Sequence, residues 1–472
     1  MPSTAPRAAD GRSAQWLALD VLAATRAPAG EIETLQRQRL SALLAAAQAT
    51  RWHRAALQGQ DLAKLPLAAL PVTNKVQLMR RFADSVTDPG ITLDAVREFC
   101  ADPQRIGQPW CGRYWLWESS GSSGQPGWFV QDEAAMAVYD ALEATRRHSP
   151  RPLARLFDPL GLAERVAFVG AIDGHFASVV SVRRLMAAQP WLASNWRCLS
   201  ILQPVSALLA QLDDFAPTVL ATYPTAAVML ASEALRGRLR ARPAEVWTGG
   251  ETLSPLMRRY VEQTFGAAVR NSYGASEFLP IAWECGRGRL HVNADWVILE
   301  AVDTQFRPVP QGRLSHTTLL TNLANHLQPL IRFDIGDRIV FAAAPCGCGS
   351  ALPVLEVQGR RDDMLVVPGR DGAAVMLLPL ALSTVLEEGA GVFDFQLRHT
   401  GGRELLLLLG PQAPRTAAVR TRCRRLLADY AATQGATGLR ICTQDAGQLP
   451  LGRSGKLKRI VAAKGARARL RA

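Results

Sequence analysis

The chain has 472 residues, of which 48% are hydrophobic and 20% are charged, the composition of an ordinary soluble globular protein. A chain of this length predicts two or three domains. No apolar run approaches the length of a membrane span, and the polar residues 1–12 are not followed by the apolar region of a signal peptide. We therefore expect a cytoplasmic protein without a membrane span.

The formal net charge of +13 fits nucleic acid, an anionic membrane surface or an acidic protein partner. Outside the C-terminal tail, however, the basic residues are spread along the chain. A nucleic-acid-binding protein would need a clustered basic face with interleaved aromatic residues. We therefore expect a solvated basic surface and no nucleic-acid partner. The more specific alternative is that the basic charge attracts a polyanionic substrate or an acidic protein partner.

The first elements are predicted to be helical. Residues 16–54 carry apolar side chains at helical spacing. Pro66 and Pro71 interrupt this pattern, and Asn74 is expected to cap a further helix through Phe82. A glycine- and serine-rich stretch follows, and another helix is expected from Glu133.

Short apolar runs that look like buried strands alternate with helical stretches in the middle of the chain, at 166–169, 218–221, 245–248 and 269–273. Strands that alternate with helices predict an α/β fold with mostly parallel sheets flanked by helices. Ligands of such sheets collect in the loops beyond the carboxyl ends of the strands. The loops that follow these runs are therefore candidate binding loops.

The sequence pattern changes after Leu290, where successive strands are expected at 297–302, 314–320 and 338–342. These strands predict a β-rich subdomain over about 285–358. A stretch rich in glycine and charge, 359–363, marks a boundary. We expect a large N-terminal domain, 1–361, and a small α+β domain, 362–472, with a strand at 404–409 and a helix at 417–434.

The glycine-rich stretch 117–128 reads W-E-S-S-G-S-S-G-Q-P-G-W. Glycine admits tight turns and lets backbone N–H groups approach an anion, and phosphate is the anion that most often needs such a cradle. A flexible Gly/Ser connection is the alternative, but the stretch is short, bracketed by apolar residues and stiffened by Pro126. We interpret it as a phosphate loop. A phosphotransferase or NTP hydrolase would instead require G-x-x-x-x-G-K-[ST], which does not follow Trp117.

Four further positions carry charge in suggestive places. Glu251 ends T-G-G-E and is explained equally well as a buried capping residue. Glu277 ends Y-G-A-S-E and is suited to Mg²⁺, which prefers one or two carboxylates together with substrate phosphates. Asp337 would accept two ribose hydroxyls or cap a turn. Lys456, on a glycine turn, would be a mobile charge for a phosphate or carboxylate, or a solvated lysine of a basic tail.

The order of these motifs resembles the adenylate-forming superfamily of acyl-CoA synthetases, and within it the phenylacetate–CoA ligase-like branch. Residues 119–127 resemble the family's phosphate loop, 273–277 its Y-G-x-T-E motif, 332–337 its R-[FY]-x-x-G-D motif and 359–363 its hinge, and Lys456 falls on its catalytic lysine. The opening that ends at Lys75 is also similar to that branch. The phosphate loop departs from the family in its serine pair and in Gly127, which stands where a lysine is usual.

The resemblance implies ATP as substrate, Mg²⁺ as cofactor and a mobile C-terminal domain. Lys456, Glu277 and Ser276 would be catalytic, with Glu277 on Mg²⁺ and Lys456 stabilising charge while a carboxylate attacks the α-phosphate. Tyr273 would stack on adenine, and Asp337 and Arg360 would hold the ribose. The implied ATP and AMP contacts also include Ser119, Ser120, Gly121, Ser122, Ser123, Gly124, Gly250, Glu251, Asn271 and Gly274.

Cys285, His291, Cys346 and Cys348 form a second group of candidate ligands. Three thiolates and one imidazole make a closed tetrahedral zinc site, which would be structural and not catalytic. Unrelated core or surface residues are the alternative.

The substrate is expected to be an aromatic acid such as a hydroxybenzoate, because aromatic residues are available to line a flat apolar pocket. The candidate substrate-binding residues are Tyr139, His175, Phe176, Tyr223, Pro224 and Gly249. The acyl acceptor would be the thiol of coenzyme A or of an acyl carrier protein, the latter favoured by the basic charge of the chain, and the protein would be a monomer or homodimer. The alternatives are adenylation followed by amide formation or AMP transfer, and a zinc-stabilised nucleic-acid-binding protein that is not an enzyme.

Overall fold

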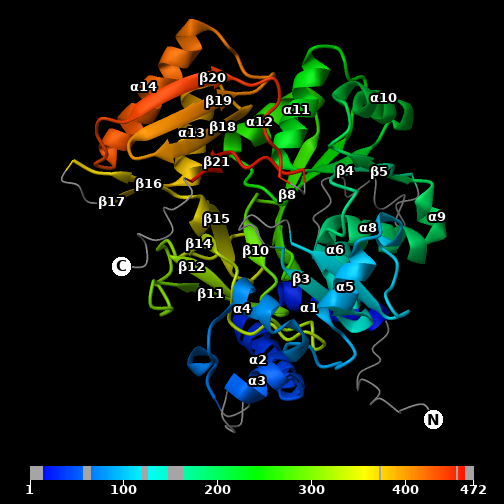
Figure 1. Ribbon diagram of the computed structural model, residues 1–472. Coiled ribbons are helices and arrows are strands. Elements are labelled where there is room, and N and C mark those ends of the chain that lie inside the picture. Colours follow the sequence, from blue (N-terminus) through cyan, green and yellow to red (C-terminus); the bar gives the residue numbers. More distant parts are fainter. Residues whose placement is uncertain are drawn as a thin grey trace.

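The computed structural model describes residues 14–56, 65–119, 126–146, 163–370, 374–452 and 455–462. It has the predicted α/β fold, in which helices flank large sheets (Figure 1). Helices α13 and α14 lie at one end of the molecule and helices α2, α3 and α4 at the other, with the largest sheet between them.

The largest sheet has nine strands in the order β14-β15-β10-β9-β8-β7-β6-β4-β5. The strands are β4 (Val166–Gly170), β5 (Trp196–Ser200), β6 (Val219–Thr222), β7 (Glu245–Thr248), β8 (Ala268–Ala275), β9 (Phe278–Glu284), β10 (Leu290–Val292), β14 (Asp337–Phe341) and β15 (Val354–Arg360). The neighbouring strands β5, β4, β6, β7 and β8 pair in parallel. The strands β8, β9, β10, β15 and β14 pair antiparallel. The four predicted central strands are thus confirmed, and the sheet as a whole is mixed.

Successive residues of the parallel strands point to opposite faces, and each face has its own core. Val169, Val246 and Val269 pack with helices α10, α11 and α12 on one face. Phe168 and Tyr273 face the other way and pack with helices α6 and α8. These helices are α6 (Glu133–Arg146), α8 (Ala177–Ala188), α9 (Pro190–Ala193), α10 (Val205–Phe215), α11 (Pro224–Leu235) and α12 (Pro255–Phe265).

A second sheet contains four strands in the order β1-β13-β12-β11. They are β1 (Thr73–Asn74), β11 (Val297–Val302), β12 (Thr317–Asn322) and β13 (Phe333–Asp334). The strands of the region 285–358 are therefore shared between two sheets, because β10, β14 and β15 extend the nine-stranded sheet. A separate hairpin is formed by β2 (Tyr114–Glu118) and β3 (Trp128–Asp132), on either side of the predicted phosphate loop.

The N-terminal region is helical, as predicted. Its helices are α1 (Ala14–Arg26), α2 (Ala29–Ala47), α3 (Arg51–Ala56), α4 (Lys75–Arg80) and α5 (Leu93–Cys100). Asn74 caps α4 in a capping box with Gln77. The helix ends at Arg80, before the predicted Phe82, which opens a short 3₁₀ turn.

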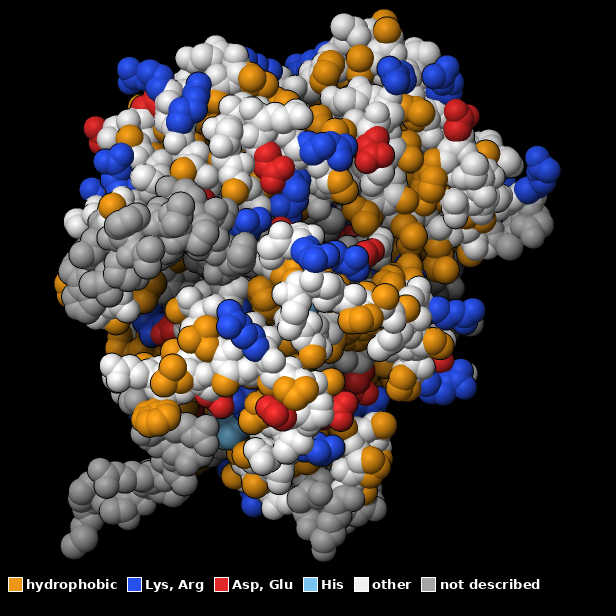
Figure 2. All heavy atoms as spheres, turned by 180° about the vertical axis from the view of Figure 1, so that it is seen from behind, with side chains coloured by type: hydrophobic (Ala, Val, Ile, Leu, Met, Phe, Trp, Pro, Cys, Tyr) orange, Lys and Arg blue, Asp and Glu red, His pale blue; other side chains and the backbone are white. Residues whose placement is uncertain are grey.

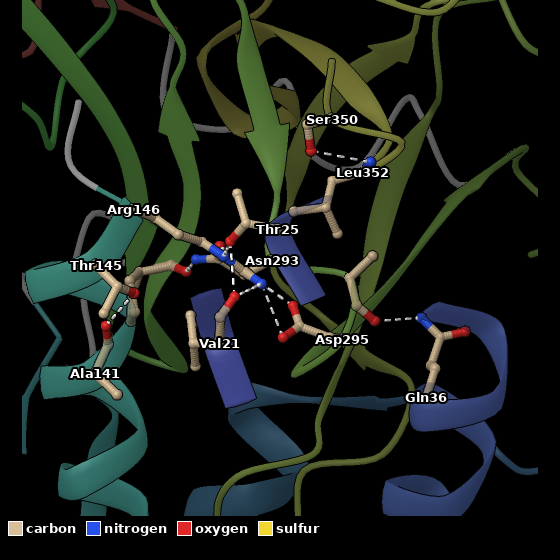
Figure 3. A network of polar contacts seen from close by, with 12 residues as sticks. Val21, Thr25, Gln36, Ala141, Thr145, Arg146, Asn293, Asp295, Ser350 and Leu352 are labelled. Atoms are coloured by element: carbon tan, nitrogen blue, oxygen red, sulfur yellow. Dashed lines mark hydrogen bonds and ion pairs between the residues drawn. The ribbon is translucent and has the colours of Figure 1, made fainter. Parts of the chain in front are cut away.

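Helices α1 and α6 are joined to the loop after β10 by a buried polar network (Figure 3). The guanidinium of Arg146 donates to both carboxylate oxygens of Asp295, at 2.7 and 2.9 Å, and both side chains are fully buried. Arg146 also donates to Asn293 and to Thr25. The network therefore fixes α6, one of the helices that cover the sheet, against the N-terminal helices.

The C-terminal part contains a β hairpin and a four-stranded sheet in the order β20-β19-β18-β21. Its elements are β16 (Leu365–Pro368), β17 (Ala374–Leu377), α13 (Pro379–Ala390), β18 (Phe395–Gly401), β19 (Glu404–Leu409), α14 (Ala417–Thr433), β20 (Arg440–Asp445) and β21 (Ile460–Val461). This part has its own hydrophobic core, formed by buried residues in the range 365–460. The domain boundary at residues 361 and 362 stays a prediction.

On the face of the molecule shown in Figure 2, lysine and arginine side chains are scattered among acidic and uncharged ones. The described residues of this face therefore form no continuous basic patch. Within the described part of the chain, no helix is both long and apolar enough to cross a membrane.

Candidate active site

Several of the predicted nucleotide- and substrate-binding residues lie at the carboxyl ends of β6, β7 and β8. Tyr223 follows β6, Gly249 and Gly250 follow β7, and Tyr273 and Gly274 lie near the end of β8. Because these strands are parallel neighbours, their carboxyl ends meet at one edge of the sheet. Gly250 has a φ of +77°, a left-handed conformation that residues with a side chain rarely adopt.

Lys456 comes from the C-terminal part of the chain and reaches this same edge. Its ammonium lies 5.5 Å from the centre of the Tyr223 ring. Its Nζ and Cε both lie 2.9 Å from the position that a Cβ would occupy at Gly250. The lysine therefore fits beside Gly250 only because this residue lacks a side chain. Burial lowers the pKa of Lys456 below its ordinary value, and the carboxylate of Glu251 opposes that shift.

Glu251 joins the lysine segment to the large sheet. One carboxylate oxygen accepts from the backbone N–H of Leu457 at 2.9 Å. The other accepts from the backbone and hydroxyl of Thr225, at 3.1 and 2.8 Å, at the start of α11. Burial raises the pKa of Glu251, whereas its hydrogen bonds lower it. Glu251 is thus a capping residue of α11 and an anchor for the segment that carries Lys456.

Tyr273, Asp337 and Arg360 form a second cluster at this edge. The Tyr273 hydroxyl donates to Asp337 at 2.6 Å, and the Arg360 Nε lies 3.6 Å from the other carboxylate oxygen. Arg360 also donates to the backbone carbonyl of Ile335. Burial and the adjacent Asp337 carboxylate raise the pKa of Tyr273 well above its ordinary value. A ribose would meet a carboxylate acceptor and a guanidinium donor here.

Ser276 and Glu277 follow directly on β8, and their backbone is held by two distant side chains. The Trp117 indole donates to the carbonyl of Ser276, and Asn322 donates to the carbonyl of Glu277. Burial raises the pKa of Glu277, and the positive charges of Arg360 and Lys75 oppose this shift. Asn271 is tied into the sheet, where its N–H donates to Glu284 and its side chain accepts from Thr248.

The predicted phosphate loop is closed at its base by Ser119 and Gly127. The backbone N–H of Ser119 donates to the carbonyl of Gly127 at 2.7 Å, and the N–H of Gly127 donates to the Ser119 hydroxyl at 2.8 Å. The remaining predicted loop contacts lie outside the described residues; they are Ser120, Gly121, Ser122, Ser123 and Gly124.

Lys75 lies beside the base of this loop, a placement that the sequence analysis missed. Its Cδ is 3.0 Å from the position that a Cβ would occupy at Gly127. Gly127 is the residue that stands where the family usually has a lysine. The aliphatic part of the Lys75 side chain, from the first residue of α4, therefore lies next to position 127. The only signal in the sequence was the resemblance of the segment that ends at Lys75.

The predicted substrate-binding residues are distributed over several environments. Tyr139 is buried in the core, and its hydroxyl interacts with Gln131 and Asn322. The His175 ring is hydrogen-bonded to the carbonyl of Asp102 at 3.1 Å, and Phe176 is the N-cap residue of α8. Tyr223, Pro224 and Gly249 lie at the sheet edge beside Lys456.

A cavity opens next to Gly249, between α6 and strands β7 to β9. It is lined by Leu142, Glu143, Trp247, Thr248, Arg270, Asn271, Ser272, Pro280, Ala282, Trp283, Glu284 and Asn293. None of the six predicted substrate-binding residues belongs to this lining.

The four candidate zinc ligands come together, with their ligand atoms within 4.8 Å of one another. The sulfur atoms of Cys285 and Cys346 are 3.8 Å apart, and Cys348 Sγ is 3.3 Å from His291 Nε2. A tetrahedral site with Zn–S bonds of about 2.3 Å separates its sulfurs by about 3.8 Å. The other ring nitrogen of His291 is hydrogen-bonded to the carbonyl of Leu352, which leaves Nε2 for a metal. The donor set therefore fits zinc.

The chain has the fold of the adenylate-forming superfamily of acyl-CoA ligases, which confirms the predicted resemblance at the level of fold. It is similar over 95% of its length to 2-hydroxyisobutyryl-CoA ligase in the postadenylation state with 2-HIB-AMP, covering 93% of that chain at 20% identity and a TM-score of 0.68. The same ligase in its thioesterification state, with 2-HIB-AMP and CoA, matches over 95% and 93% of the chains, also at 20% identity, with a TM-score of 0.55.

A benzoate CoA ligase from Burkholderia xenovorans LB400 is 18% identical, with a TM-score of 0.50 over 75% of this chain and 68% of that one. Protein CapK of Staphylococcus aureus is 28% identical over 133 residues, so this chain matches only 28% of the length of that curated relative. No family model matches the chain.

Proposed function

We propose that the protein activates a carboxylic acid with ATP and transfers the acyl group to a thiol. In the first step a carboxylate oxygen attacks the α-phosphorus of ATP, the bond to the β-phosphate breaks, and pyrophosphate leaves. In the second step a thiolate attacks the acyl carbon of the mixed anhydride, and AMP leaves. The observation that carries this proposal is the position of Lys456 beside Gly250, at the edge that also holds Tyr273, Asp337 and Arg360.

Each of these residues has a role in the first step that its surroundings support. Asp337 and Arg360 would bind the ribose, and Tyr273, oriented by its hydrogen bond to Asp337, would pack on the adenine. The ammonium of Lys456 would stabilise the negative charge that develops as the carboxylate attacks. Lys75 would add a second positive charge next to the phosphate loop. Mg²⁺, when bound, supplies positive charge at the phosphates, and Glu277 is the carboxylate available to hold it.

The C-terminal segment would serve the two steps in turn. A mixed anhydride must be kept from water until the thiol arrives, and the thiol then needs a path to it. Glu251 holds the lysine segment through one backbone hydrogen bond, which can break at a small cost in free energy. The higher TM-score with the postadenylation than with the thioesterification state of the same ligase supports assigning the present arrangement to the adenylation side of the cycle.

We further propose an aromatic acid as substrate, supported by Trp247 and Trp283 in the cavity beside Gly249. The thiol would belong to an acyl carrier protein or to coenzyme A. The net charge of +13 favours an acidic carrier protein as the partner. The phenylacetate–CoA ligase-like branch is the part of the superfamily that these assignments fit.

Cys285, His291, Cys346 and Cys348 would hold a structural Zn²⁺. The ion would tie the end of β9 and strand β10 to the turn between β14 and β15, and would leave no open position for substrate. Metal analysis of the purified protein tests this assignment, with about one zinc per chain expected. A Cys346→Ser protein that retained its full zinc content would refute it.

The test of the proposed function is acid-dependent exchange of pyrophosphate into ATP, screened over aryl and fatty acids. Active acids are then offered coenzyme A or a carrier protein and followed for thioester formation. We expect exchange with at least one aryl acid and thioester formation with one of the two thiols. Absence of exchange with every acid would reject adenylation, and exchange without any thioester would favour amide formation or AMP transfer.

A further inference from the structure

Ser276 and Glu277 form the two-residue turn of the hairpin between β8 and β9, in which Ala275 pairs with Phe278. Two-residue hairpin turns favour a positive φ at the first or at both positions, because such a backbone matches the twist of the strands. Neither of these two described residues has a positive φ. The register of the two strands also shifts between Tyr273 and Ala275. The hairpin itself therefore does little to favour the conformation of this turn, which must be stabilised by contacts from elsewhere.

Two buried side chains from other elements hold the backbone of the turn. The indole N–H of Trp117, on β2, donates to the carbonyl of Ser276 at 2.8 Å. The side-chain amide of Asn322, the last residue of β12, donates to the carbonyl of Glu277 at 2.9 Å. Both Trp117 and Asn322 are 0% exposed. Since the two carbonyls belong to consecutive residues, these hydrogen bonds orient the peptide planes on both sides of the Glu277 Cα.

The direction in which the Glu277 side chain leaves the backbone follows from these two peptide planes. Together they define φ and ψ of Glu277, and with them the position of its Cβ and the rotamers that are open to it. Burial raises the pKa of the Glu277 carboxyl, and the positive charges of Arg360 and Lys75 lower it. The carboxylate is therefore close both to the ribose-binding cluster and to the base of the phosphate loop. A carboxylate so placed fits Mg²⁺, which takes one or two carboxylates together with substrate phosphates.

Trp117 also belongs to the hairpin that carries the phosphate loop. It lies two residues before Ser119, whose backbone and hydroxyl close the base of that loop on Gly127. We infer that Trp117 and Asn322 are positioning residues, which aim the carboxylate of Glu277 at the Mg²⁺ on the phosphates of ATP. If the proposed function is correct, the indole N–H of Trp117 thus ties the Mg²⁺ ligand to the phosphate loop, and neither residue needs to touch the substrate.

The chain offers a matched control for each of these residues. Trp128 lies in the same hairpin as Trp117 and is 8% exposed, but its indole N–H has no hydrogen-bond partner among the described residues. Asn322 and Asn325 cap the chain in the same way, since the side-chain oxygen of each accepts from the backbone N–H groups two and three residues later. The amide of Asn325, however, donates to strand β3 and not to the turn. Each pair of variants therefore isolates the contact with the turn.

The experiment measures the affinity for α,β-methylene-ATP, which cannot release pyrophosphate, by calorimetric titration with and without Mg²⁺. The gain in affinity on adding Mg²⁺ should be about 3- to 10-fold smaller in Trp117→Phe and in Asn322→Thr than in the unaltered protein, the range for one lost hydrogen bond. Trp128→Phe and Asn325→Thr should keep the full gain. In the exchange reaction, the half-saturating Mg²⁺ concentration should rise by the same factor in the first two variants, with kcat at saturating Mg²⁺ little changed.

An unchanged gain in both variants, or no gain in the unaltered protein, would overturn the inference. An equal loss of affinity with and without Mg²⁺ would also overturn it, because a merely structural role weakens nucleotide binding under both conditions. Trp117 and Asn322 lie on different strands, so either variant decides the question if the other fails to fold. If exchange fails with every acid while the gain falls in the variants, adenylation is rejected and the positioning role stands. If exchange proceeds and the gain is unchanged, the positioning role alone is rejected.

Discussion

Two pairs of oppositely charged residues lie where distant parts of this chain meet, and the two junctions are built differently. Arg146 and Asp295 are fully buried, share two hydrogen bonds and are surrounded by further partners from α1 and the loop after β10 (Figure 3). Glu251 and Lys456 are only partly buried, and Glu251 contacts the lysine segment through the backbone N–H of Leu457. The first pair is suited to a permanent junction, and the second to a contact that forms and breaks.

The largest effect on stability should follow from breaking the permanent junction. Asp295→Ala leaves the Arg146 guanidinium buried without its carboxylate, and such a loss typically costs about 3–5 kcal/mol. We expect a large fall in the midpoint of urea unfolding. Asp94→Ala is the control, since Asp94 is 96% exposed in its pair with Arg97 and should leave the midpoint unchanged. Similar midpoints for the two variants would contradict the contrast between the pairs.

A side chain at Gly250 should block the second contact without altering the fold. Gly250→Ala places a Cβ 2.9 Å from Lys456 Nζ, at a φ of +77°. We expect exchange activity to fall about 10- to 100-fold, the range for a displaced charge-stabilising group, and thioester formation from preformed acyl-AMP to fall less. Gly237→Ala is the matched control, because Gly237 has a φ of +73° and nothing within 4 Å of the added Cβ. Equal losses in the two variants would show that backbone strain, and not Lys456, is responsible.

The pH dependence of the exchange reaction should report the charge of Lys456. Burial lowers the pKa of this ammonium below its ordinary value of 10.5, and Glu251 opposes the shift. The active form is the cation, so the exchange rate should fall as pH rises through the lowered pKa, on an alkaline limb below pH 10.5. Glu251→Gln removes the opposing charge and should move this limb to lower pH, a smaller effect than that of Gly250→Ala. If the alkaline limb does not move, the charge of Glu251 does not influence the pKa of Lys456.

Several elements could be predicted from the sequence because their signals are local. The strands at 297–302 and 404–409 have the predicted bounds, and Asn74 caps α4 as expected. The four zinc-ligand candidates were identified by residue type and are brought together by two neighbouring hairpins.

Other features depend on contacts between residues far apart in the chain. The hydroxyl of Tyr139 meets Asn322, which is 183 residues away, so no local pattern could show that this tyrosine belongs to the core. Arg270 and Glu284 stand on strands, where charged residues indicate a solvent-exposed face, and their cavity follows only from the position of α6. Lys75 and Gly127 likewise come together only through the packing of α4 against the β2–β3 hairpin.

The most direct test of the account is to separate the two half-reactions in Lys456→Ala. Acid-dependent pyrophosphate exchange measures the first step, and thioester formation from chemically prepared acyl-AMP measures the second. Since Lys456 would act only while the carboxylate attacks the α-phosphate, we expect exchange to fall about 10²- to 10³-fold, with thioester formation within a few-fold of the unaltered protein. An equal loss in both steps, or no loss in the first, would contradict the role assigned to this lysine.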